Sequence, residues 1–508
     1  MMKGLSKSRY TLFCQCPKAL WLNIYKPEEA EVDKSLEARL RAGNAVGDLA
    51  MRLFGDYTEV TTYKEDGTLD LGAMINKTTE EMERGTENIC EASFSFEGNY
   101  CAVDILRKTP DGWAIYEVKS ASFSMSSENT VKLEKYAPDI AYQKWVLEKC
   151  GVKVTGTFLV CLDSDYVRDG DLDIQQLFMT KDMEELVGNE YSKVAARVKQ
   201  ALEVLGKEAE PQRDLSECCN KPYRCAFWTY CAKKHEVPNP SVFNLYGMPF
   251  SKKMAYYHEG FRTLESLNEK LELNSIQRMQ IDSEQTGKAH INTSGIKEFL
   301  DKLFYPLYFL DFETMQDAIP QYDGARPYQQ IPFQYSLHIK QNENQAYEHR
   351  EFLAPSDGSD PRRLLAEQLC RDIPMNVCTV AYNKSFECTR IRELASLYPE
   401  LSEHLNNIAN RIVDLIDPFR AGDYYVKAMN GSFSIKSVLP ALFPDDPELN
   451  YHNLDTRVQN GGDAMNIFPR IRYMAPEEAQ ASREALLRYC ELDTWAMVKV
   501  WEKLKVSP

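Results

Sequence analysis

The sequence has no apolar run that approaches the roughly 20 residues needed to span a bilayer. It also lacks an excess of positive charge, because 60 Lys and Arg residues stand against 76 Asp and Glu residues and give a formal charge of −16. This balance argues against a protein that coats polyanions with its whole surface, so any nucleic-acid contact would use a local basic groove. Residues 1–22 show neither the apolar stretch nor the small-residue cleavage site of a signal peptide. We therefore expect a cytoplasmic protein without a membrane partner.

Internal repeats and low-complexity tracts are also missing. The 508 residues suggest about three domains at about 150 residues each, and a hydrophobic content of 44% is ordinary for a folded chain. Two changes of pattern divide the chain. Residues 1–232 mix helical stretches with a compact β region, residues 233–300 have a helical pattern, and residues 301–508 open with a strand and close with a long helix. The sequence thus predicts a multidomain α/β protein.

The fourteen cysteines do not indicate a disulfide framework, because the cytoplasm keeps thiols reduced. Their distribution is uneven: four crowd into residues 218–231, and Cys14 and Cys16 lie near the N-terminus. The scattered ones are typical of buried core residues. The crowded ones favour metal binding, since four thiolates suit either a 4Fe-4S cluster or a zinc ion.

Residues 101–121 predict a β-hairpin that carries two carboxylates and a lysine. Asp111-Gly112 marks the turn, and strand alternation places Glu117 and Lys119 on one face. The hairpin folds Asp104 back beside them. Two carboxylates can hold Mg²⁺, and a nearby lysine can orient or activate an attacking water. An exposed Glu–Lys pair on a surface strand is the alternative interpretation.

A second group of acidic residues lies in the last 200 residues. They are predicted on a buried strand (Asp311 and Glu313), in the first turn of a helix (Glu387) and four residues apart on the last helix (Tyr489 and Asp493). Four converging carboxylates would hold two metal ions ~3.5–4 Å apart, which is the arrangement of two-metal phosphodiester hydrolysis. Their mutual repulsion without cations argues against a purely structural role. The alternative is a helix-packing tyrosine beside solvated acids.

The hairpin and the helix that follows it resemble the PD-(D/E)xK nucleases of the RecB-like branch. D-I-L, a hairpin and E-V-K match the core motif, and PDIAYQKWVLEK matches the glutamine motif with Gln143 in the corresponding position. The resemblance implies a restriction-endonuclease-like domain whose site residues are Asp104, Glu117, Lys119 and Gln143, with metal at the two carboxylates. Gly47 stands where many members carry a metal-binding histidine. Glu91 is a further candidate ligand, or else a structural residue at a strand start.

The opening SKSRYTLFCQCPKALWL and the segment CCNKPYRCAFWTYC resemble RecB-like nucleases that carry an iron–sulfur cluster, including the CRISPR-associated adaptation nucleases. The resemblance implies that Cys16, Cys219, Cys225 and Cys231 hold a 4Fe-4S cluster, with zinc as the alternative. The spacing C-x5-C-x5-C departs from the commoner C-x2-C-x5-C, and Cys218 competes with Cys219 as a ligand.

The acidic residues of the last 200 positions resemble those of DnaQ-like, DEDD-type 3′–5′ exonucleases, which have the RNase H-like fold. The matching residues are Asp311 and Glu313 in the first motif, Asn383, Phe386 and Glu387 in the second, and Tyr489 and Asp493 in the third, in its tyrosine version. Glu387 stands where most members have Asp. The segment with Lys436 resembles the one that borders the site in RNase D-like relatives, although an exposed lysine is the simpler interpretation.

The three parts together resemble one bacterial family of unknown function with an iron–sulfur RecB-like half and a DnaQ-like half. Residues 256–267 loosely resemble a helix-hairpin-helix, and a plain helical linker is the alternative. The resemblance implies a nuclease that uses Mg²⁺ or Mn²⁺ and acts on nucleic acid, for which we favour DNA over RNA. Two alternatives stay open: an RNA-processing exonuclease, and a nucleic-acid-binding scaffold with one or both centres inactive, as Gly47 and Glu387 would permit.

Overall fold

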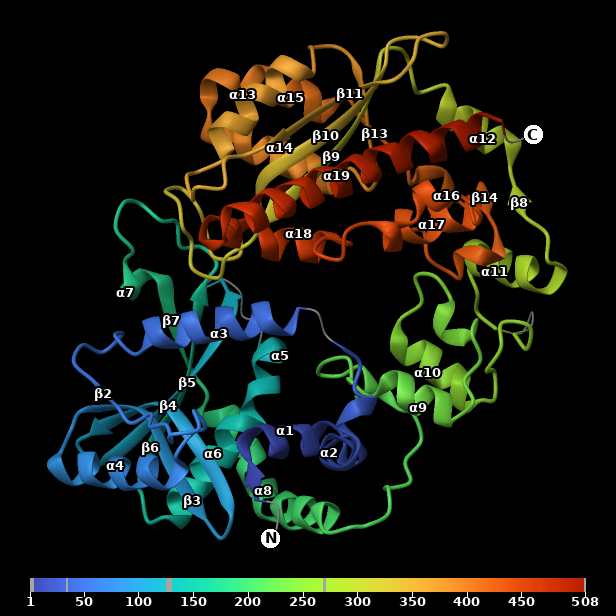
Figure 1. Ribbon diagram of the computed structural model, residues 1–508. Helices are drawn as coiled ribbons and strands as arrows, with labels where there is room; N and C mark the ends of the chain where they lie inside the picture. Colours follow the sequence, from blue (N-terminus) through green and yellow to red (C-terminus); the bar gives the residue numbers. More distant parts are fainter. Residues whose placement is uncertain (1–3, 33–34, 125–129, 268–270, 507–508) are drawn as a thin grey trace. The chain divides into compact units, whose positions relative to one another are not determined.

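The computed structural model describes residues 4–32, 35–124, 130–267 and 271–506 (Figure 1). The chain forms two compact units. Unit 1 comprises Met1–Glu236 and Asp317–Gln329, and unit 2 comprises Val237–Gln316 and Gln330–Pro508. Within the described ranges, no helix combines the length and the apolar character needed to cross a membrane.

Unit 1 is built on a mixed sheet with the strand order β2-β3-β4-β5-β6-β7, and β1 pairs with β4 in parallel. The strands β3, β4 and β5 form an antiparallel meander, whereas β6 runs parallel to β5. Thr109 pairs with Gly112, so residues 110 and 111 form the two-residue hairpin turn that the sequence predicts. The strands are β1 (Leu5–Ser6), β2 (Thr58–Glu59), β3 (Asn88–Phe96), β4 (Asn99–Thr109), β5 (Gly112–Phe123), β6 (Val154–Asp163) and β7 (Phe178–Asp182).

Helices cover both faces of this sheet. Successive strand residues enter two different cores: Ile105 and Ala114 pack on one face, and Leu106 and Ile115 on the other. Burial on both faces explains why these strands are nearly continuous apolar runs. The helices of unit 1 are α1 (Lys7–Gln15), α2 (Pro17–Tyr25), α3 (Leu36–Ala50), α4 (Leu71–Arg84), α5 (Thr130–Leu133), α6 (Ala137–Lys149), α7 (Ile174–Leu177), α8 (Glu184–Leu205) and α9 (Trp228–Lys234).

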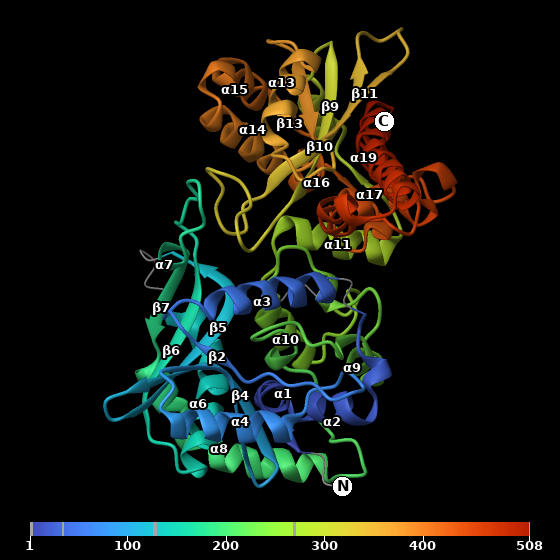
Figure 2. The same cartoon turned by 60° about the vertical axis from the view of Figure 1, so that its left-hand side comes forward.

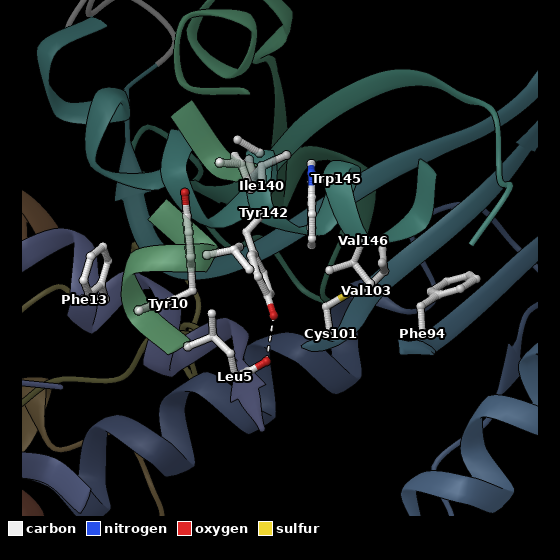
Figure 3. Close-up of a cluster of buried hydrophobic side chains, with 14 of the residues drawn as sticks. Leu5, Tyr10, Phe13, Phe94, Cys101, Val103, Ile140, Tyr142, Trp145 and Val146 are labelled. Carbon is white, nitrogen blue, oxygen red and sulfur yellow. Dashed lines mark hydrogen bonds between the residues drawn. The ribbon is translucent and has the colours of Figure 1, made fainter. Parts of the chain in front are cut away.

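One buried cluster ties the N-terminus of unit 1 to α6 (Figure 3). The rings of Tyr10 and Tyr142 stack with centroids 4.6 Å apart, and the Tyr142 hydroxyl donates a hydrogen bond of 2.7 Å to the carbonyl of Leu5. Each fully buried aromatic side chain of this kind contributes about 1.5–3 kcal/mol. The cluster holds β1 and the start of α1 against α6, and thereby places Lys7 and Gln143, which neighbour these residues in the chain.

Residues 317–329, which lie between β9 and β10 in the chain, belong to unit 1. The amide of Arg168 donates to the carbonyl of Ala325, and the amide of Gly324 donates to the carbonyl of Arg168. The Tyr328 hydroxyl donates to the carbonyl of Ser120, at the end of β5. Ala318 is buried in the core that also contains residues of α3.

Unit 2 contains a sheet with the strand order β11-β10-β9-β12-β13 (Figure 2). β10 is antiparallel to both β9 and β11, whereas β12 is parallel to β9 and to β13. These strands are β9 (Leu307–Met315), β10 (Ile331–Lys340), β11 (Glu348–Leu353), β12 (Cys378–Ala381) and β13 (Ile412–Asp414). A small antiparallel pair is formed by β8 (His290–Ile291) and β14 (Tyr424–Tyr425).

The two faces of this sheet are covered differently. One face packs Leu310 and Leu337 against α13 (Arg362–Asp372), α14 (Ser385–Leu397) and α15 (Ser402–Asn410). The long helix α19 (Pro476–Lys505) packs on β9 and β10. The strand at 307–315, the turn at Asn383 and the last helix all lie where the sequence predicts them. The other helices of unit 2 are α10 (Phe250–His258), α11 (Ser275–Thr286), α12 (Thr293–Leu300), α16 (Asp417–Ala421), α17 (Ile435–Leu442) and α18 (Gly461–Ile467).

The helical pattern of residues 233–300 corresponds to α10, α11 and α12, whereas α9 ends at Lys234. The segment that resembles a helix-hairpin-helix begins in α10 and turns at Gly260, whose φ of 93° suits glycine. Residues 261–267 form turns instead of a second helix, and residues 268–270 lie outside the described part of the chain.

Candidate functional site

The four residues that the sequence predicts for the first centre lie together in unit 1. The amide of Val118 donates a 2.6 Å hydrogen bond to Asp104, which ties β4 to β5. Lys119 Nζ lies 2.5 Å from Glu117 Oε1, and Gln143 Nε2 donates to Glu117 Oε2 at 2.7 Å. Glu117 is completely buried, so its carboxylate depends on these partners in place of water.

Two further residues complete this centre. Lys7 Nζ lies 3.1 Å from both carboxylate oxygens of Glu117 and 3.7 Å from Asp104 Oδ1. Asp139, one helical turn before Gln143, accepts from Lys119 at 2.9 Å and from Gln143 at 3.2 Å. The centre is therefore a network of carboxylates around two lysines, and one of the lysines comes from the first turn of α1.

The two carboxylates of this centre differ in their affinity for protons. Burial disfavours the charge of Glu117, but the positive charges of Lys119 and Lys7 outweigh it and lower the pKa of Glu117. Burial and the charge of Glu117 raise the pKa of Asp104 to about 6. Burial and the charge of Asp104 also raise the pKa of Glu91, on β3, to about 7. A divalent cation would relieve the repulsion between Asp104 and its acidic neighbours, so these residues fit a metal.

Gly47 lies in α3, a helix that packs against β5. A Cβ atom at this position would meet nothing within 4 Å. Crowding at the backbone therefore does not exclude a histidine at this position. The buried Oε1 atom of Gln143 has no hydrogen-bond partner in the described residues, which leaves one acceptor beside the two carboxylates.

The crowded cysteines of unit 1 line one cavity with about 390 Å³ of empty space, including its open mouth. Cys218 hydrogen-bonds with the thiols of Cys16 and Cys219, which lowers its pKa, and burial raises the pKa of the thiols of Cys225 and Cys231. All four predicted ligands and the competing Cys218 thus reach the same space. This donor set fits a metal with thiolate ligands.

A buried ion network supports the cysteine cavity. Glu210 lies 3.0 Å from Lys18, which is 3% exposed, and 2.8 Å from Lys234. Gln15 donates to the carbonyls of Cys218 and Tyr223. The first helices of the chain are therefore joined to the cysteine-rich segment by side-chain contacts as well as by the thiols.

The second centre lies in a cleft of unit 2 with about 900 Å³ of empty space, including its open mouth. Every site residue that the sequence predicts for this centre lines the cleft: Asp311, Glu313, Asn383, Phe386, Glu387, Lys436, Tyr489 and Asp493. β9 supplies the first two, the turn before α14 and its first turn supply the next three, α17 supplies Lys436 and α19 supplies the last two. One ligand atom each of Asp311, Glu313 and Cys490 lies within 4.8 Å of the others.

The carboxylates of this cleft hold protons more tightly than ordinary carboxylates. Burial raises the pKa of Asp311 well above its usual value, and the charges of Asp493, Glu313 and Glu387 add to that rise. Burial and the charge of Asp493 raise the pKa of Glu313 in the same way. Burial raises the pKa of Glu387 to about 8, and its buried Oε2 atom has no hydrogen-bond partner in the described residues. Such a cluster fits divalent cations, which would replace the protons.

Two hydroxyl groups and one ammonium organise the α19 side of the cleft. The Tyr451 hydroxyl donates to Asp493 Oδ1 at 2.5 Å. Lys436 Nζ donates to the Tyr489 hydroxyl at 2.8 Å and lies about 5 Å from the ring centroids of Tyr451 (5.1 Å) and Tyr489 (4.9 Å). Lys436 is exposed, as its simpler interpretation predicts, but its ammonium reaches the predicted site.

Asn383 forms the turn between β12 and α14 with a φ of 68°, a left-handed conformation that Asn tolerates better than most residues. Asp414 in β13 accepts hydrogen bonds from the amides of Asn383, at 2.7 Å, and Lys384, at 3.1 Å. Arg420 donates to the Asn383 side chain. Asp414 therefore fixes the turn that presents Glu387 to the cleft.

Sequence reasoning missed Lys7, Asp139, Asp414 and Tyr451. Asp139 had a local signal, because it lies one helical turn before Gln143 and shares its face. The other three reach their sites from segments that are distant in the chain, and neither spacing nor strand alternation indicates such contacts.

Comparison with known proteins gives a partial match. Residues 308–434 match a family described as "Domain of unknown function (DUF2779)", a stretch that includes Asp311, Glu313 and Glu387 but ends before α17 and α19. The chain is 27% identical over 224 residues to the uncharacterized protein MG366 of Mycoplasma genitalium. This match covers 40% of this chain and 32% of MG366. It is 28% identical over 219 residues to the Mycoplasma pneumoniae homologue of MG366, and this match covers 40% of this chain and 33% of the relative. It is 27% identical over 214 residues to the uncharacterized protein UU173 of Ureaplasma parvum, and this match covers 38% of this chain and 30% of the relative. Each match therefore spans about a third of the length of the relative.

Proposed function

We propose that the chain is a divalent-metal-dependent nuclease with two centres. Unit 1 would carry a RecB-like PD-(D/E)xK centre, and unit 2 a DnaQ-like 3′–5′ exonuclease centre. The observation that carries the proposal is the environment of Asp311, which interacts with three other carboxylates in one cleft. Repulsion among these carboxylates destabilises the folded chain, and bound cations would remove that repulsion. Bound Mg²⁺ or Mn²⁺ would activate water and stabilise the leaving oxygen of a phosphodiester.

The fold of unit 2 supports this proposal. The order β11-β10-β9-β12-β13, with β10 alone antiparallel to the other strands, agrees with the RNase H-like fold of DnaQ-like exonucleases. The side chains of the chain itself would have defined tasks. Asp311, Glu313, Glu387 and Asp493 would hold the cations. The Tyr489 hydroxyl, which accepts a hydrogen bond from Lys436, would orient water at the reacting phosphate.

In unit 1, Asp104 and Glu117 would hold the cation, while Lys119 would orient water and Gln143 would fix the Glu117 carboxylate through its hydrogen bond. The preference for DNA rests on the resemblance of this unit to RecB-like nucleases. The cysteines would hold a 4Fe-4S cluster, or zinc in the alternative, that joins the first helices to the segment at 218–231. Its role would be structural, because closing so long a loop restricts the unfolded chain.

The test uses the full chain with end-labelled single- and double-stranded DNA and RNA, in Mg²⁺ or Mn²⁺. Glu117→Ala should remove one cleavage activity and keep trimming from the 3′ end, whereas Asp311→Ala should do the reverse. Glu448→Ala, which changes an exposed carboxylate, is the matched control and should behave as the parent. Activity on RNA alone would favour the RNA-processing alternative. A parent that binds nucleic acid without cutting it would favour the scaffold, and a double variant as active as the parent would reject both centres.

A further inference from the structure

A second group of metal-ligating side chains lies in unit 2, outside the carboxylate cleft. His338 in β10 pairs directly with His349 in β11, and their rings lie with centroids 4.7 Å apart. Glu491 from α19 completes the group: one ligand atom from each of the three residues lies within 4.8 Å of the others. The chain has only seven histidines, so chance alone would rarely bring two of them together across neighbouring strands beside a carboxylate.

The geometry of α19 separates this group from the carboxylate cleft. Successive residues of an α-helix are rotated by about 100°, so Tyr489 and Asp493 share one side of the helix. Glu491 and Trp495 lie on a different side, and the His338 ring contacts Trp495 with centroids 5.2 Å apart. One helix thus contributes to two groups of side chains on its two flanks.

The hydrogen bonds around the two imidazoles orient them for a cation. Thr494 Oγ1 lies 3.1 Å from the carbonyl of Glu491, to which it donates, so it accepts from His338 Nδ1 at 2.8 Å. Ser336 Oγ lies 2.7 Å from Thr494 Oγ1 and 2.9 Å from His349 Nε2. With Ser336 donating to Thr494, each imidazole would donate one N–H to this chain of hydroxyls. The lone pairs of His338 Nε2 and His349 Nδ1 are then left for a ligand, and His349 Nδ1 lies 3.9 Å from Glu491 Oε1.

Metal-binding histidines typically use this arrangement, in which the second nitrogen donates to a fixed acceptor and sets the tautomer. His338 is only 6% exposed, and burial favours the neutral form of an imidazole. Glu351, two residues after His349 and on the same face of β11, is a fourth candidate ligand. Burial and the negative charge of Glu491 contribute to the raised pKa of Glu351.

We propose that unit 2 binds a zinc-type divalent cation through His338, His349 and Glu491, at a site separate from the carboxylate cleft. Two imidazoles and one or two carboxylates suit zinc better than Mg²⁺, which prefers oxygen ligands alone. The ion would join β10 and β11 to α19, the helix that presents Tyr489 and Asp493 on its other flank. The site needs none of the nuclease residues, so the proposal stands without the proposed function.

The test measures zinc bound per chain by the as-purified full-length protein, with Mg²⁺ in excess to occupy the carboxylate centres and a chromophoric chelator to set the free zinc concentration. The parent should bind one zinc ion more than His349→Gln. Glu491→Gln should weaken this binding by about tenfold or more. His452→Gln, which changes an exposed histidine elsewhere in unit 2, should bind as the parent does.

Both informative variants change side chains that are partly exposed, by 26% for His349 and 49% for Glu491, so the fold should tolerate them. Circular dichroism and the retained metal of the cysteine cavity check this directly. Equal zinc binding by the parent, His349→Gln and Glu491→Gln would overturn the proposal. Loss of zinc from Asp493→Asn but not from His349→Gln would assign the ion to the carboxylate cleft and overturn it as well.

Discussion

The ammonium of Lys7 lies 3.1 Å from each carboxylate oxygen of Glu117, although 110 residues separate them in the chain. It also lies 3.7 Å from Asp104, so one lysine contacts both carboxylates that the sequence predicts as metal ligands. A cation held by the same oxygens would compete with this ammonium. Lys7 therefore balances the charge of the centre when no metal is bound.

Removing this ammonium should favour metal binding. We expect Lys7→Met to lower the Mg²⁺ concentration for half-maximal cleavage by the unit 1 centre, by about tenfold, since a hydrogen bond to a charged group is worth about 1.5–3 kcal/mol. The same variant should unfold at a lower temperature in EDTA, because Lys119 is then left to offset the repulsion between Asp104 and Glu117. The measurements are a Mg²⁺ titration of cleavage in the Asp311→Ala background and thermal unfolding without metal. Lys207→Met, at an exposed position, is the control. A Mg²⁺ requirement that is unchanged or higher in Lys7→Met would contradict the competition.

The cysteine cavity allows a second prediction. Protein purified without oxygen should be brown and contain iron, and Cys225→Ala should lose both the colour and the iron. Cys218→Ser and Cys219→Ser, made separately, should rank these two competing thiols, because only the variant that lacks the ligand should lose the colour and the iron.

Iron analysis and absorption spectra of these variants provide the measurement, with Cys150→Ser as the exposed control. A colourless protein with stoichiometric zinc would replace the cluster by zinc and leave the four ligands in place. A protein without iron or zinc would reject the metal assignment altogether.

The local parts of both centres could be predicted from the sequence. The turn at residues 110–111, which Asp111-Gly112 marks in the sequence, and the alternation of β5 place Asp104, Glu117 and Lys119 together, because hairpin register depends on residues that are close in the chain. The left-handed Asn383 similarly marks the end of β12. These features follow from backbone geometry that is specific to short segments.

The remaining parts depend on tertiary contacts. Lys7 reaches Glu117 because the stack of Tyr10 on Tyr142 holds α1 against α6. Tyr451 reaches Asp493 from a short 3₁₀ helix (Tyr451–Asn453) that no sequence periodicity indicates. The spacing of residues in the sequence predicts neither contact. It also does not predict that residues 317–329, which lie within the last 200 residues, pack in unit 1.

The raised pKa of Glu387 leads to a third prediction, on pH-dependent stability. Its folded value of about 8 lies above the usual value of 4.5, so the folded protein binds this proton more tightly than the unfolded chain. The stability that it contributes is complete below about pH 4.5 and is lost as the pH rises through 8. In EDTA, we expect the stability of the parent to fall between pH 6 and pH 9. The side chain stays neutral in Glu387→Gln, so the stability of this variant should fall less steeply with pH. At pH 9 the difference in this fall should be about 1–3 kcal/mol.

Differential scanning calorimetry across this pH range measures the effect. Added Mg²⁺ should reduce the fall for the parent, because it binds the deprotonated carboxylates. Glu448→Gln, at an exposed position, should follow the parent. Parallel curves for the parent and Glu387→Gln would show that this carboxyl group is not protonated in the folded protein at neutral pH.

The last prediction concerns the order of sensitivity within the cleft of unit 2. Asp311 feels the charges of Asp493, Glu313 and Glu387, and one of its carboxylate oxygens lies within 4.8 Å of one from Glu313. Asp311→Ala should therefore leave no detectable trimming from the 3′ end, a loss of about a thousandfold or more when several kcal/mol of transition-state stabilisation disappear. Asp493→Ala should leave nearly none.

The two tyrosines should matter less, because each acts through one hydroxyl. Tyr489→Phe removes the partner of Lys436, and Tyr451→Phe removes the donor to Asp493, so each should keep a measurable remainder, about 10- to 100-fold below the parent. Glu387→Asp should retain or raise activity, since the proposed DnaQ-like centre would usually have the shorter aspartate at this position. The assay follows 3′-end trimming in the Glu117→Ala background, where the centre of unit 1 is removed. A terminal 3′ phosphate on the substrate should slow a 3′–5′ exonuclease far more than an endonuclease. Trimming that persists unchanged in Asp311→Ala would reject this centre, and a loss in Tyr451→Phe as deep as that in Asp311→Ala would reject the proposed order.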